Sequence, residues 1–279
     1  MVAPTPVSAY LHSATMVKAG VYLVARLAPM FALTGSWRGL VLVVGATTML
    51  VGGLRALRQH DLKLLLAYGT VSQLGFMMLL LGVGDYHIAE AGIVLLLAHG
   101  AFKAALFMVV GIVDHETGTR DIRELHGFGS AAGWRAVKVV AVVSAASMAG
   151  LPPLFGFIAK EKALDGYLEH GDFAGGTAAL VVIVLASILT FAYSARFVLG
   201  VGDYHIAEAG IVLLLAHGAF KAALFMVVGI VDHETGTRDI RELHGFGSDA
   251  GWRTVKVVAV ISAASMAGLP PLFGFIAKE

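Results

Sequence analysis

Long apolar stretches constrain the fold of this sequence more than any other feature. A helix needs about 20 mostly apolar residues to cross the hydrocarbon core of a bilayer. Only 14% of the 279 residues are charged, whereas ordinary soluble domains are about one-quarter charged. We therefore expect an all-α protein, a polytopic transmembrane helical bundle, with the lipid bilayer as its surroundings. The stretches long enough to span run over residues 6–33, 40–57, 62–83, 88–113, 136–168 and 175–198.

The fifth stretch is interrupted by the sequence GLPPLFG, Gly150–Gly156. Proline in a helix interior removes a backbone donor and clashes with the preceding turn, so two adjacent prolines should break the helix. The piece before the break has about 15 residues, or roughly 22 Å of helix, which is too short for a bilayer core about 30 Å thick. We expect one broken helix that crosses once. Its break, Gly150–Gly156, should be non-helical and covered by protein, because lipid cannot satisfy exposed backbone groups.

Composition and motif content exclude several classes of function. A net charge of +1 gives no global field that would attract nucleic acid, so we expect no nucleic-acid partner. The sequence has no cysteine, which rules out disulfides and cysteine-based metal or redox sites. It has no phosphate-binding glycine loop, zinc-ligand spacing or hydrolase motif, so we expect no cofactor, no metal ion and no catalytic residues. The first residues lack the basic segment of a signal peptide, and we expect the sequence to begin inside a larger protein.

The chain repeats itself almost completely. Leu81–Glu161 and Leu199–Glu279 align without gaps at an offset of 118 residues, and only three of the 81 aligned positions differ. The repeat is either a recent duplication or a fault in joining two related sequences, and we favour the second explanation. We divide the chain accordingly into residues 1–198 and a near-identical duplicate of 81–161 at residues 199–279. The differing pairs are Ala131/Asp249, Ala136/Thr254 and Val143/Ile261.

Basic residues distinguish the two sides of the predicted membrane protein. Arg55, Arg58 and Lys63 lie between the second and third apolar stretches, and three further arginines follow the fourth stretch. The loop between the third and fourth stretches, GVGDYH, has no lysine or arginine. Because cytoplasmic loops carry an excess of these residues, both basic loops and the N-terminus are predicted to be cytoplasmic. The three further arginines are Arg120, Arg123 and Arg135.

The motif AHGAFKAALF places His99 and Lys103 inside an apolar stretch. Residues four apart share one face of a helix. Near the middle of a span, an ionised side chain costs several kcal/mol unless water or a partner compensates it. We interpret the pair as a proton relay, because a buried lysine can load and unload a proton. The alternative is a structural pair that backbone carbonyls or a neighbouring subunit satisfy.

Four further ionisable residues are candidates with stronger structural alternatives. Lys18 lies about halfway along the first stretch and could instead extend to the interface; His12, about 120° away on the helix, could hydrogen-bond a neighbouring helix. Lys63 opens the third stretch, where a cytoplasmic charge is ordinary. Lys160 follows the break in the fifth stretch, and transporters place ion sites beside such broken helices. The alternative is that Lys160 marks a charged helix end at the surface. Polar residues that either line the path or only pack the helices are Tyr68, Ser72 and Gln73.

Four motifs resemble the antiporter-like core shared by two groups of membrane proteins. They are APTPVSAYLHSATMVKAGVYLVAR, DLKLLLAYGTVSQLGFM, AHGAFKAALF and GLPPLFGFIAKE. The resemblance covers about residues 1–200 in order, and the duplicate at residues 199–279 resembles the same core a second time, out of order. One group is the proton-pumping subunits of respiratory complex I, and the other is the A subunit of the Mrp-type multi-subunit Na+/H+ antiporters. The loop DHETGTRDIREL is similar to the Mrp form. Leu95 stands where many complex I relatives have another histidine, which also favours the Mrp type.

The resemblance implies a multi-pass protein of the bacterial cell membrane that is a transporter rather than an enzyme. With the other subunits of its complex, it would exchange monovalent cations, with sodium expected, for protons. The family's partner lysine and glutamate precede PTPVSA, so we expect a truncated piece that does not exchange ions alone. The alternatives are a membrane scaffold that transports nothing and a fragment of a complex I proton-pumping subunit.

The resemblance also assigns residues to a proton path across the midplane of the membrane. Lys18 joins this set because of its position within the first stretch. The positions that match the family motifs are His12, Lys63, His99, Lys103 and Lys160, and the counterparts in the duplicate are His217, Lys221 and Lys278.

Overall fold

The computed structural model describes residues 5–13, 15–125, 132–201, 227–228, 231, 235–236 and 250–267. In these residues the regular structure is α-helix, with one isolated bridge between Asp61 and Asp121, and the expected all-α class is confirmed. The chain forms two compact units, Met1–Ala207 and Glu208–Glu279. The boundary expected at residue 198 falls inside a helix that continues to Val201, so that division remains a prediction.

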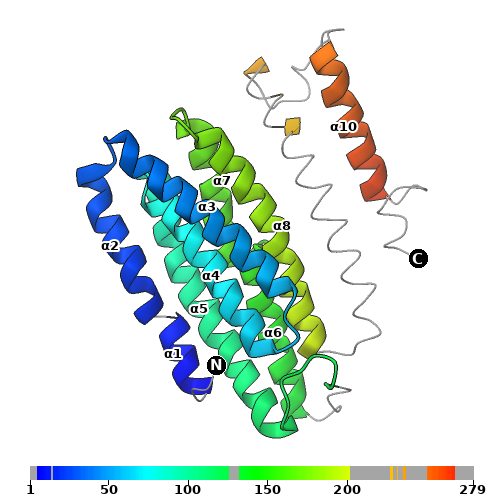
Figure 1. Ribbon diagram of the computed structural model, residues 1–279. Helices are drawn as coiled ribbons and strands as arrows, with labels where there is room; N and C mark the ends of the chain where they lie inside the picture. Colours follow the sequence, from blue (N-terminus) through cyan, green and yellow to red (C-terminus); the bar gives the residue numbers. More distant parts are fainter. Residues whose placement is uncertain are drawn as a thin grey trace. The chain divides into compact units, whose positions relative to one another are not determined.

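The first unit is a bundle of helices (Figure 1). Five helical segments of the described residues are long and apolar enough to cross a membrane: Thr5–Phe31, Gly35–Leu57, Leu62–Leu81, Tyr86–Thr117 and Gly176–Val201. These agree with the apolar stretches read from the sequence. The helices are α1 Thr5–Ser13, α2 Met16–Phe31, α3 Gly35–Leu57, α4 Leu62–Leu81, α5 Tyr86–Thr117, α6 Ala132–Ala149, α7 Phe155–His170 and α8 Gly176–Val201.

Helix α5 is the element against which most of the bundle packs. Helices α1, α4, α6 and α7 all contact it, while α3 and α8 pack on α4. Towards one end the core contains Phe102, Leu106 and Phe107, and towards the other it contains Phe76 and Ile88. The side of α5 that packs against these helices should be apolar, which makes its buried ionisable residues the informative exceptions.

The two predicted basic loops lie at the same end of the bundle. The main-chain N–H of Leu62 donates to the carbonyl of Arg120 at 3.0 Å, and the N–H of Ile122 donates to the carbonyl of His60 at 2.9 Å. The segment after α5 is thereby held against the turn between α3 and α4. Thr5, at the start of α1, lies near Gly111 of α5 at this end too. The arrangement agrees with the predicted topology, and the assignment of this end to the cytoplasm remains a prediction.

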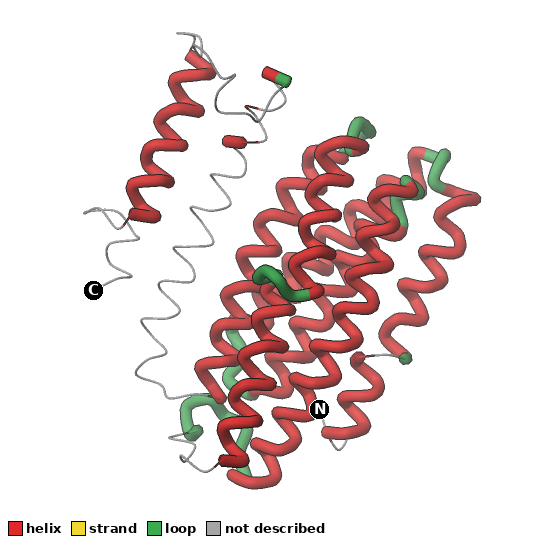
Figure 2. Tube along the Cα trace, turned by 180° about the vertical axis from the view of Figure 1, so that it is seen from behind, coloured by secondary structure: helices red, strands yellow, loops and turns green. Residues whose placement is uncertain are grey.

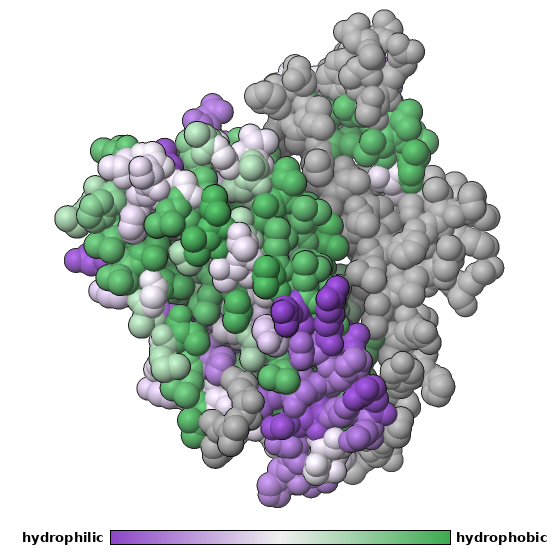
Figure 3. Space-filling model, in the orientation of Figure 1, coloured by the Kyte–Doolittle hydropathy of each residue, from purple (hydrophilic) through white to green (hydrophobic). Residues whose placement is uncertain are grey.

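Large apolar side chains cover the outer faces of the bundle. Tyr22, Leu23 and Met30 of α2 and Leu40 and Val43 of α3 are all exposed. Apolar side chains dominate much of the visible face of this unit, and hydrophilic ones gather towards its lower end (Figure 3). Such a surface suits hydrocarbon rather than water, as a multi-pass membrane protein requires.

The helix break predicted at the double proline is present between α6 and α7. Gly150–Leu154 are non-helical, whereas Phe155 and Gly156 already belong to α7, so the predicted break was too long by its last two residues. The expected cover by protein is wrong for Leu151, Pro152 and Pro153, which are exposed. The N–H of Gly156 donates to Ser147 Oγ at 3.2 Å, which allows α7 to begin early. Both halves pack along α5. Figure 2 shows a short turn segment midway along the bundle, besides the turns at its ends.

A second break, between α1 and α2, was not predicted. The sequence indicated one continuous helix over residues 6–33, but α1 ends at Ser13 and α2 begins at Met16. No proline or glycine lies there. Instead, Thr15 adopts a non-helical backbone and its hydroxyl donates to the carbonyl of Tyr10 at 3.3 Å. Side chains that bond nearby main-chain groups compete with helical hydrogen bonds, and this competition is invisible to a hydropathy window.

In the second unit, α10 covers Ala250–Ala267. These residues are the counterparts of Ala132–Ala149, which form α6 in the first copy. Two sequences that differ only at Ala136/Thr254 and Val143/Ile261 therefore form helices of the same length, as expected when local sequence determines where a helix begins and ends. The candidate residues of the duplicate, His217, Lys221 and Lys278, lie outside the described residues.

Candidate functional site

Lys103 is the most completely buried of the candidate lysines. It lies in the interior of α5 with 0% of its surface exposed, and its Nζ donates to the main-chain carbonyl of Leu66 in α4 at 2.9 Å. A Cβ atom on Gly69 would lie 3.1 Å from that Nζ, so the glycine leaves room for the ammonium against α4. No carboxylate pairs with Lys103 among the described residues. The ammonium is held by one neutral oxygen.

His99 shares a face of α5 with Lys103, as predicted, but the two side chains do not share a bonding partner. The ring of His99 is fully buried, and neither of its nitrogens has a hydrogen-bond partner among the described residues. It packs edge-on against Phe102, with ring centroids 5.4 Å apart. A buried polar ring without partners is uncommon.

Lys18 belongs to α2, and its ammonium lies against α5 beside the turn that contains His99. Its Nζ donates to the carbonyl of Leu96 at 2.8 Å and lies 3.2 Å from where a Cβ on Gly100 would be. The side chain is 8% exposed. It therefore does not extend along the bundle surface to an interface, which was the structural alternative. The unpredicted break before α2 places it against α5.

His12 extends the row towards the end of the bundle that carries the basic loops. Its ring packs against Phe107 with centroids 5.2 Å apart, and Phe107 is one turn beyond Lys103 on α5. Its Nδ1 lies 2.9 Å from the carbonyl of Ser8 and donates to it. The structure therefore brings four of the predicted residues together along α5: Lys18, His99, Lys103 and His12.

Lys63 begins α4 and is buried, with 1% of its surface exposed. Asp61 caps this helix, because its carboxylate accepts the N–H groups of Lys63 at 2.7 Å and Leu64 at 3.0 Å. Arg120 lies 3.4 Å from Asp61 and 3.6 Å from Asp114. The loop after α5 thus covers Lys63 with charged groups. The topology-marking alternative for Lys63 stays open, because this cover lies at the end of the bundle that carries the basic loops.

The covering loop contains its own ion pair outside the spanning helices. The Arg123 guanidinium donates to Asp121, with Nε 2.9 Å from Oδ1. This hydrogen bond holds the pKa of the Asp121 carboxyl well below its usual range. The same contact raises the pKa of Arg123. Asp121 and Arg123 therefore form a charged pair within this loop.

Lys160 lies in α7, just beyond the break. Its Nζ donates to the carbonyl of Ala149, the last residue of α6, at 2.8 Å, and the side chain is 9% exposed. Gly150 has φ of 84°, and a Cβ there would be 2.6 Å from Lys160 Cδ. The lysine thus folds back over the glycine to reach the end of the preceding helix. Its neighbour Lys162 is the surface residue of the pair, bonded to Glu90 of α5 at 2.6 Å.

A polar cluster beside Lys103 was only partly expected. Gln73 was noted in the sequence, and its Nε2 donates to Thr190 Oγ1 and Tyr193 OH of α8, both at 3.2 Å. The ring of Tyr193 also touches Gly69, with Cε2 3.1 Å from where a Cβ would lie. Sequence analysis missed Thr190 and Tyr193. The available signal was a group of hydroxyl side chains, Ser187, Thr190, Tyr193 and Ser194, in a mostly apolar span.

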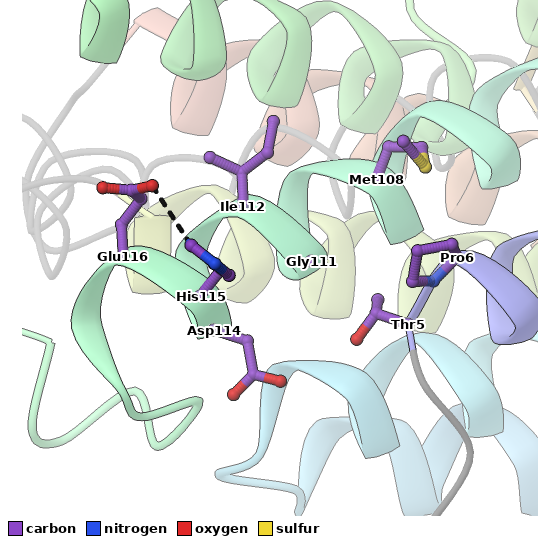
Figure 4. A pocket seen from close by; sticks show the side chains of 8 residues that line it. All are labelled: Thr5, Pro6, Met108, Gly111, Ile112, Asp114, His115 and Glu116. Atoms are coloured by element: carbon purple, nitrogen blue, oxygen red, sulfur yellow. Dashed lines mark hydrogen bonds and ion pairs between the residues drawn. The ribbon is translucent and has the colours of Figure 1, made fainter.

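An open pocket of about 580 Å³ lies between the start of α1 and the last turns of α5 (Figure 4). His115 and Glu116 approach each other there at 3.2 Å. None of the candidate lysines or histidines lines it. Among the described residues there is also no group of three or more His, Asp or Glu side chains that could hold a metal ion. The lining residues are Thr5, Pro6, Met108, Gly111, Ile112, Asp114, His115 and Glu116.

Comparison with known proteins identifies the family. The family described as NADH:quinone oxidoreductase/Mrp antiporter, TM matches residues 1–190 and 192–279. The chain belongs to this family. The A1 subunit of the Na(+)/H(+) antiporter of Staphylococcus haemolyticus is 45% identical over 218 residues, which cover 71% of this chain and 27% of that protein. The A subunit of the Na(+)/H(+) antiporter of Alkalihalophilus pseudofirmus is 48% identical over 213 residues, covering 69% and 26% respectively.

Solved structures agree with this placement in the NADH:quinone oxidoreductase/Mrp antiporter family. A chain of the Mrp complex from Dietzia sp. DQ12-45-1b has a TM-score of 0.63 and 36% identity, over 95% of this chain and 30% of its own length. The membrane-bound sulfane sulfur reductase, an archaeal respiratory membrane complex, shares the fold, with a TM-score of 0.63 and 22% identity over 95% of this chain and 51% of its own. The resemblance to the A subunit of Mrp antiporters is confirmed. The chain spans about a quarter of the length of the curated relatives, and it is a multi-pass protein of the cell membrane.

Proposed function

We propose that this chain carries a segment of the proton pathway of a monovalent cation/proton antiporter, and that sodium is the cation exchanged. The observation that carries the proposal is the row of buried ionisable groups along α5. The Lys18 ammonium lies beside the turn of α5 that contains His99, Lys103 lies one turn further along α5, and His12 packs against Phe107 in the turn after that. The names of the relatives, which are subunits of Na(+)/H(+) antiporters, supply the reaction class.

The lysines of this row are suited to release protons because each ammonium has a weak partner. Lys18, Lys103 and Lys160 each donate to one main-chain carbonyl. An ionised lysine in a membrane interior is costly unless a counter-charge compensates it. A single neutral oxygen offsets less of that cost than a carboxylate would. The charged and neutral forms then differ little in free energy, and a proton can be both accepted and passed on.

His99 supplies a second kind of proton carrier between these lysines. A neutral imidazole has one nitrogen that donates and one that accepts, and both ring nitrogens of His99 are unoccupied among the described residues. Lys160 extends the path towards the break between α6 and α7. Lys63 extends it towards the basic loops. We assign the path to His12, Lys18, Lys63, His99, Lys103 and Lys160. The partners are protons, sodium and the other subunits of an antiporter complex, within which the chain acts as a transporter rather than as an enzyme.

Replacing Lys103 with alanine in a complete antiporter complex that contains this segment tests the proposal. Sodium-driven collapse of a pH gradient, followed by a fluorescent dye in inverted vesicles, should slow about a hundredfold or more, as expected when a proton-transfer group is lost. Lys162→Ala is the matched control, because Lys162 is exposed and pairs with Glu90. Both variants should insert at the parent level. Unchanged exchange by Lys103→Ala would favour a scaffold that transports nothing.

A proton-pumping subunit of complex I is the second candidate, because the family description names NADH:quinone oxidoreductase as well as the Mrp antiporter. The same vesicles separate the two. Exchange driven by sodium without NADH supports the antiporter, whereas proton movement that requires NADH and a quinone supports the complex I type.

A further inference from the structure

One buried oxygen near Lys103 has no donor. Gln73 is fully buried in α4, and its Nε2 makes two hydrogen bonds to α8. Its Oε1 has no partner among the described residues. A buried acceptor left unpaired loses the water it would otherwise bind and gains nothing in exchange. Turning the amide round would exchange two hydrogen bonds to α8 for one, because the Thr190 hydroxyl already donates to Ala186 at 2.8 Å and only Tyr193 OH could donate to an oxygen placed there.

The orphan oxygen lies one helical turn from the present position of the Lys103 ammonium. That ammonium lies beside Gly69, and Gln73 follows Gly69 by four residues on the same face of α4. The ring of Tyr193 reaches from Gly69 to Gln73, because its Cε2 atom touches Gly69 and its hydroxyl accepts a hydrogen bond from Gln73. One turn of helix rises about 5.4 Å, a distance that rotation about the four side-chain carbons of a lysine can cover.

His99 lies at the level of Gln73. Helices α4 and α5 are antiparallel, as shown by Gly92 against Leu81 and Lys103 against Leu66. Lys103 lies beside Gly69 of α4. His99 precedes Lys103 by one turn of α5, and Gln73 follows Gly69 by one turn of α4, so His99 and Gln73 lie at the same level. Both residues carry buried polar atoms without partners among the described residues. Lys103, one turn away from this level, is the lysine of α5 that reaches α4.

We propose that Gln73 Oε1 is a second docking oxygen for the Lys103 ammonium, so that Gln73 is a positioning residue that brings Lys103 to His99. Docked on Leu66, the ammonium faces the end with the basic loops. Docked on Gln73, it passes a proton from Nζ to a neutral ring nitrogen of His99, leaving a neutral amine and an imidazolium. The neutral amine then returns towards Leu66. The inference rests on the proposed antiporter function and deepens it.

The test measures the pH profile of sodium-driven exchange for two variants in the complete complex. Gln73→Met removes the docking oxygen, so Lys103 should lose its proton more readily: maximal exchange should fall about tenfold, the effect of one lost hydrogen bond to a charge, with its optimum at lower pH. Gln73→Glu offers a carboxylate, which favours the charged lysine. Its optimum should move to higher pH. Gln59→Met is the control, because the Gln59 amide donates to the carbonyl of Arg55 near the basic loops, away from Lys103 and His99, and it should keep the parent profile.

Opposite shifts of the two optima support the docking role. A purely structural role for Gln73 would lower the amount of inserted protein or the maximal rate without moving the optimum, and unshifted profiles would overturn the inference. If Gln73→Met does not insert, Gln73→Glu decides alone by the direction of its shift. Failure of the proposed function is separate, since it appears as normal exchange by Lys103→Ala.

Discussion

Lys103 and Lys160 make the same contact in two different ways. Each is a buried lysine whose ammonium donates to one main-chain carbonyl, at 2.9 Å and 2.8 Å. Lys103 meets an intact helix, where the carbonyl of Leu66 also accepts the Thr70 hydroxyl at 2.9 Å. Lys160 meets a helix end, where the carbonyl of Ala149 has no partner within its own helix. The last carbonyls of a helix always need such outside donors.

The difference separates what the fold needs from what transport needs. At the break, Lys160 satisfies a carbonyl that would otherwise be orphaned and places a cation at the negative end of the α6 dipole, so it stabilises the fold. At α4, the Leu66 carbonyl is satisfied without Lys103, and the ammonium adds little to stability. Lys18 follows the second pattern, on Leu96 of intact α5. Stability and exchange should therefore respond differently to substitution in the two regions.

The largest expected effect on stability is at the break, in Gly156→Ala. A Cβ on Gly156 would lie 1.8 Å from the carbonyl oxygen of Ser147, a backbone atom that cannot move aside. Overpacking of this kind costs about 3 kcal/mol or more of unfolding free energy. The measurement is loss of helical circular dichroism on titration with a denaturing detergent. Gly39→Ala is the control, because nothing lies within 4 Å of its Cβ position, and alanine there should stabilise the helix slightly.

An unchanged titration midpoint for Gly156→Ala would mean that the two halves of the broken helix move apart freely. The close packing at the break would then contribute little to the stability of the fold. That result would contradict the claim that the fold depends on the region around Lys160 more than on the region around Lys103.

Lys160→Met should have an intermediate effect. It leaves the Ala149 carbonyl unpaired in an apolar setting, which costs about 1–3 kcal/mol, while methionine fills most of the vacated volume. Lys103→Met, measured in the same detergent titration, should cost less than about 1 kcal/mol or stabilise the chain, since it removes a charge whose burial is unfavourable. Equal losses for the two methionine variants would contradict the distinction between Lys160, which also stabilises the fold, and Lys103, which does not.

The two breaks show how far the sequence could predict the structure. The break at Pro152–Pro153 was predictable because proline removes a donor in any setting. The break at Thr15 depends on a side-chain hydroxyl that bonds the Tyr10 carbonyl, and the same residues could equally continue a helix. The spans were predictable because a bilayer imposes a minimum apolar length, whichever neighbours a helix has.

The site was predictable where a single helix determines it and not where distant segments meet. His99 and Lys103 share a face because of their spacing alone. The burial of Lys63 depends on the loop around Arg120, more than 50 residues away in the sequence, folding over α4. The contact between Gln73 and Tyr193 joins residues 120 positions apart. Spacing carries no information on such pairs.

Gly69→Ala should have the smallest effect on stability and sharpens the comparison at Lys103. The added Cβ would lie 3.1 Å from Lys103 Nζ and from Tyr193 Cε2, so its neighbours must yield by a few tenths of an ångström. The end of a lysine side chain can do this, and alanine gains about 0.5–1 kcal/mol over glycine in a helix interior, so the unfolding midpoint should hardly change. Exchange should slow, because the ammonium is displaced from the Leu66 carbonyl. Gly20→Ala, with open space at its Cβ position, should affect neither quantity. A loss of stability as large as that of Lys160→Met would show that the fold itself requires the Lys103 contact, and the two lysine sites would then be alike.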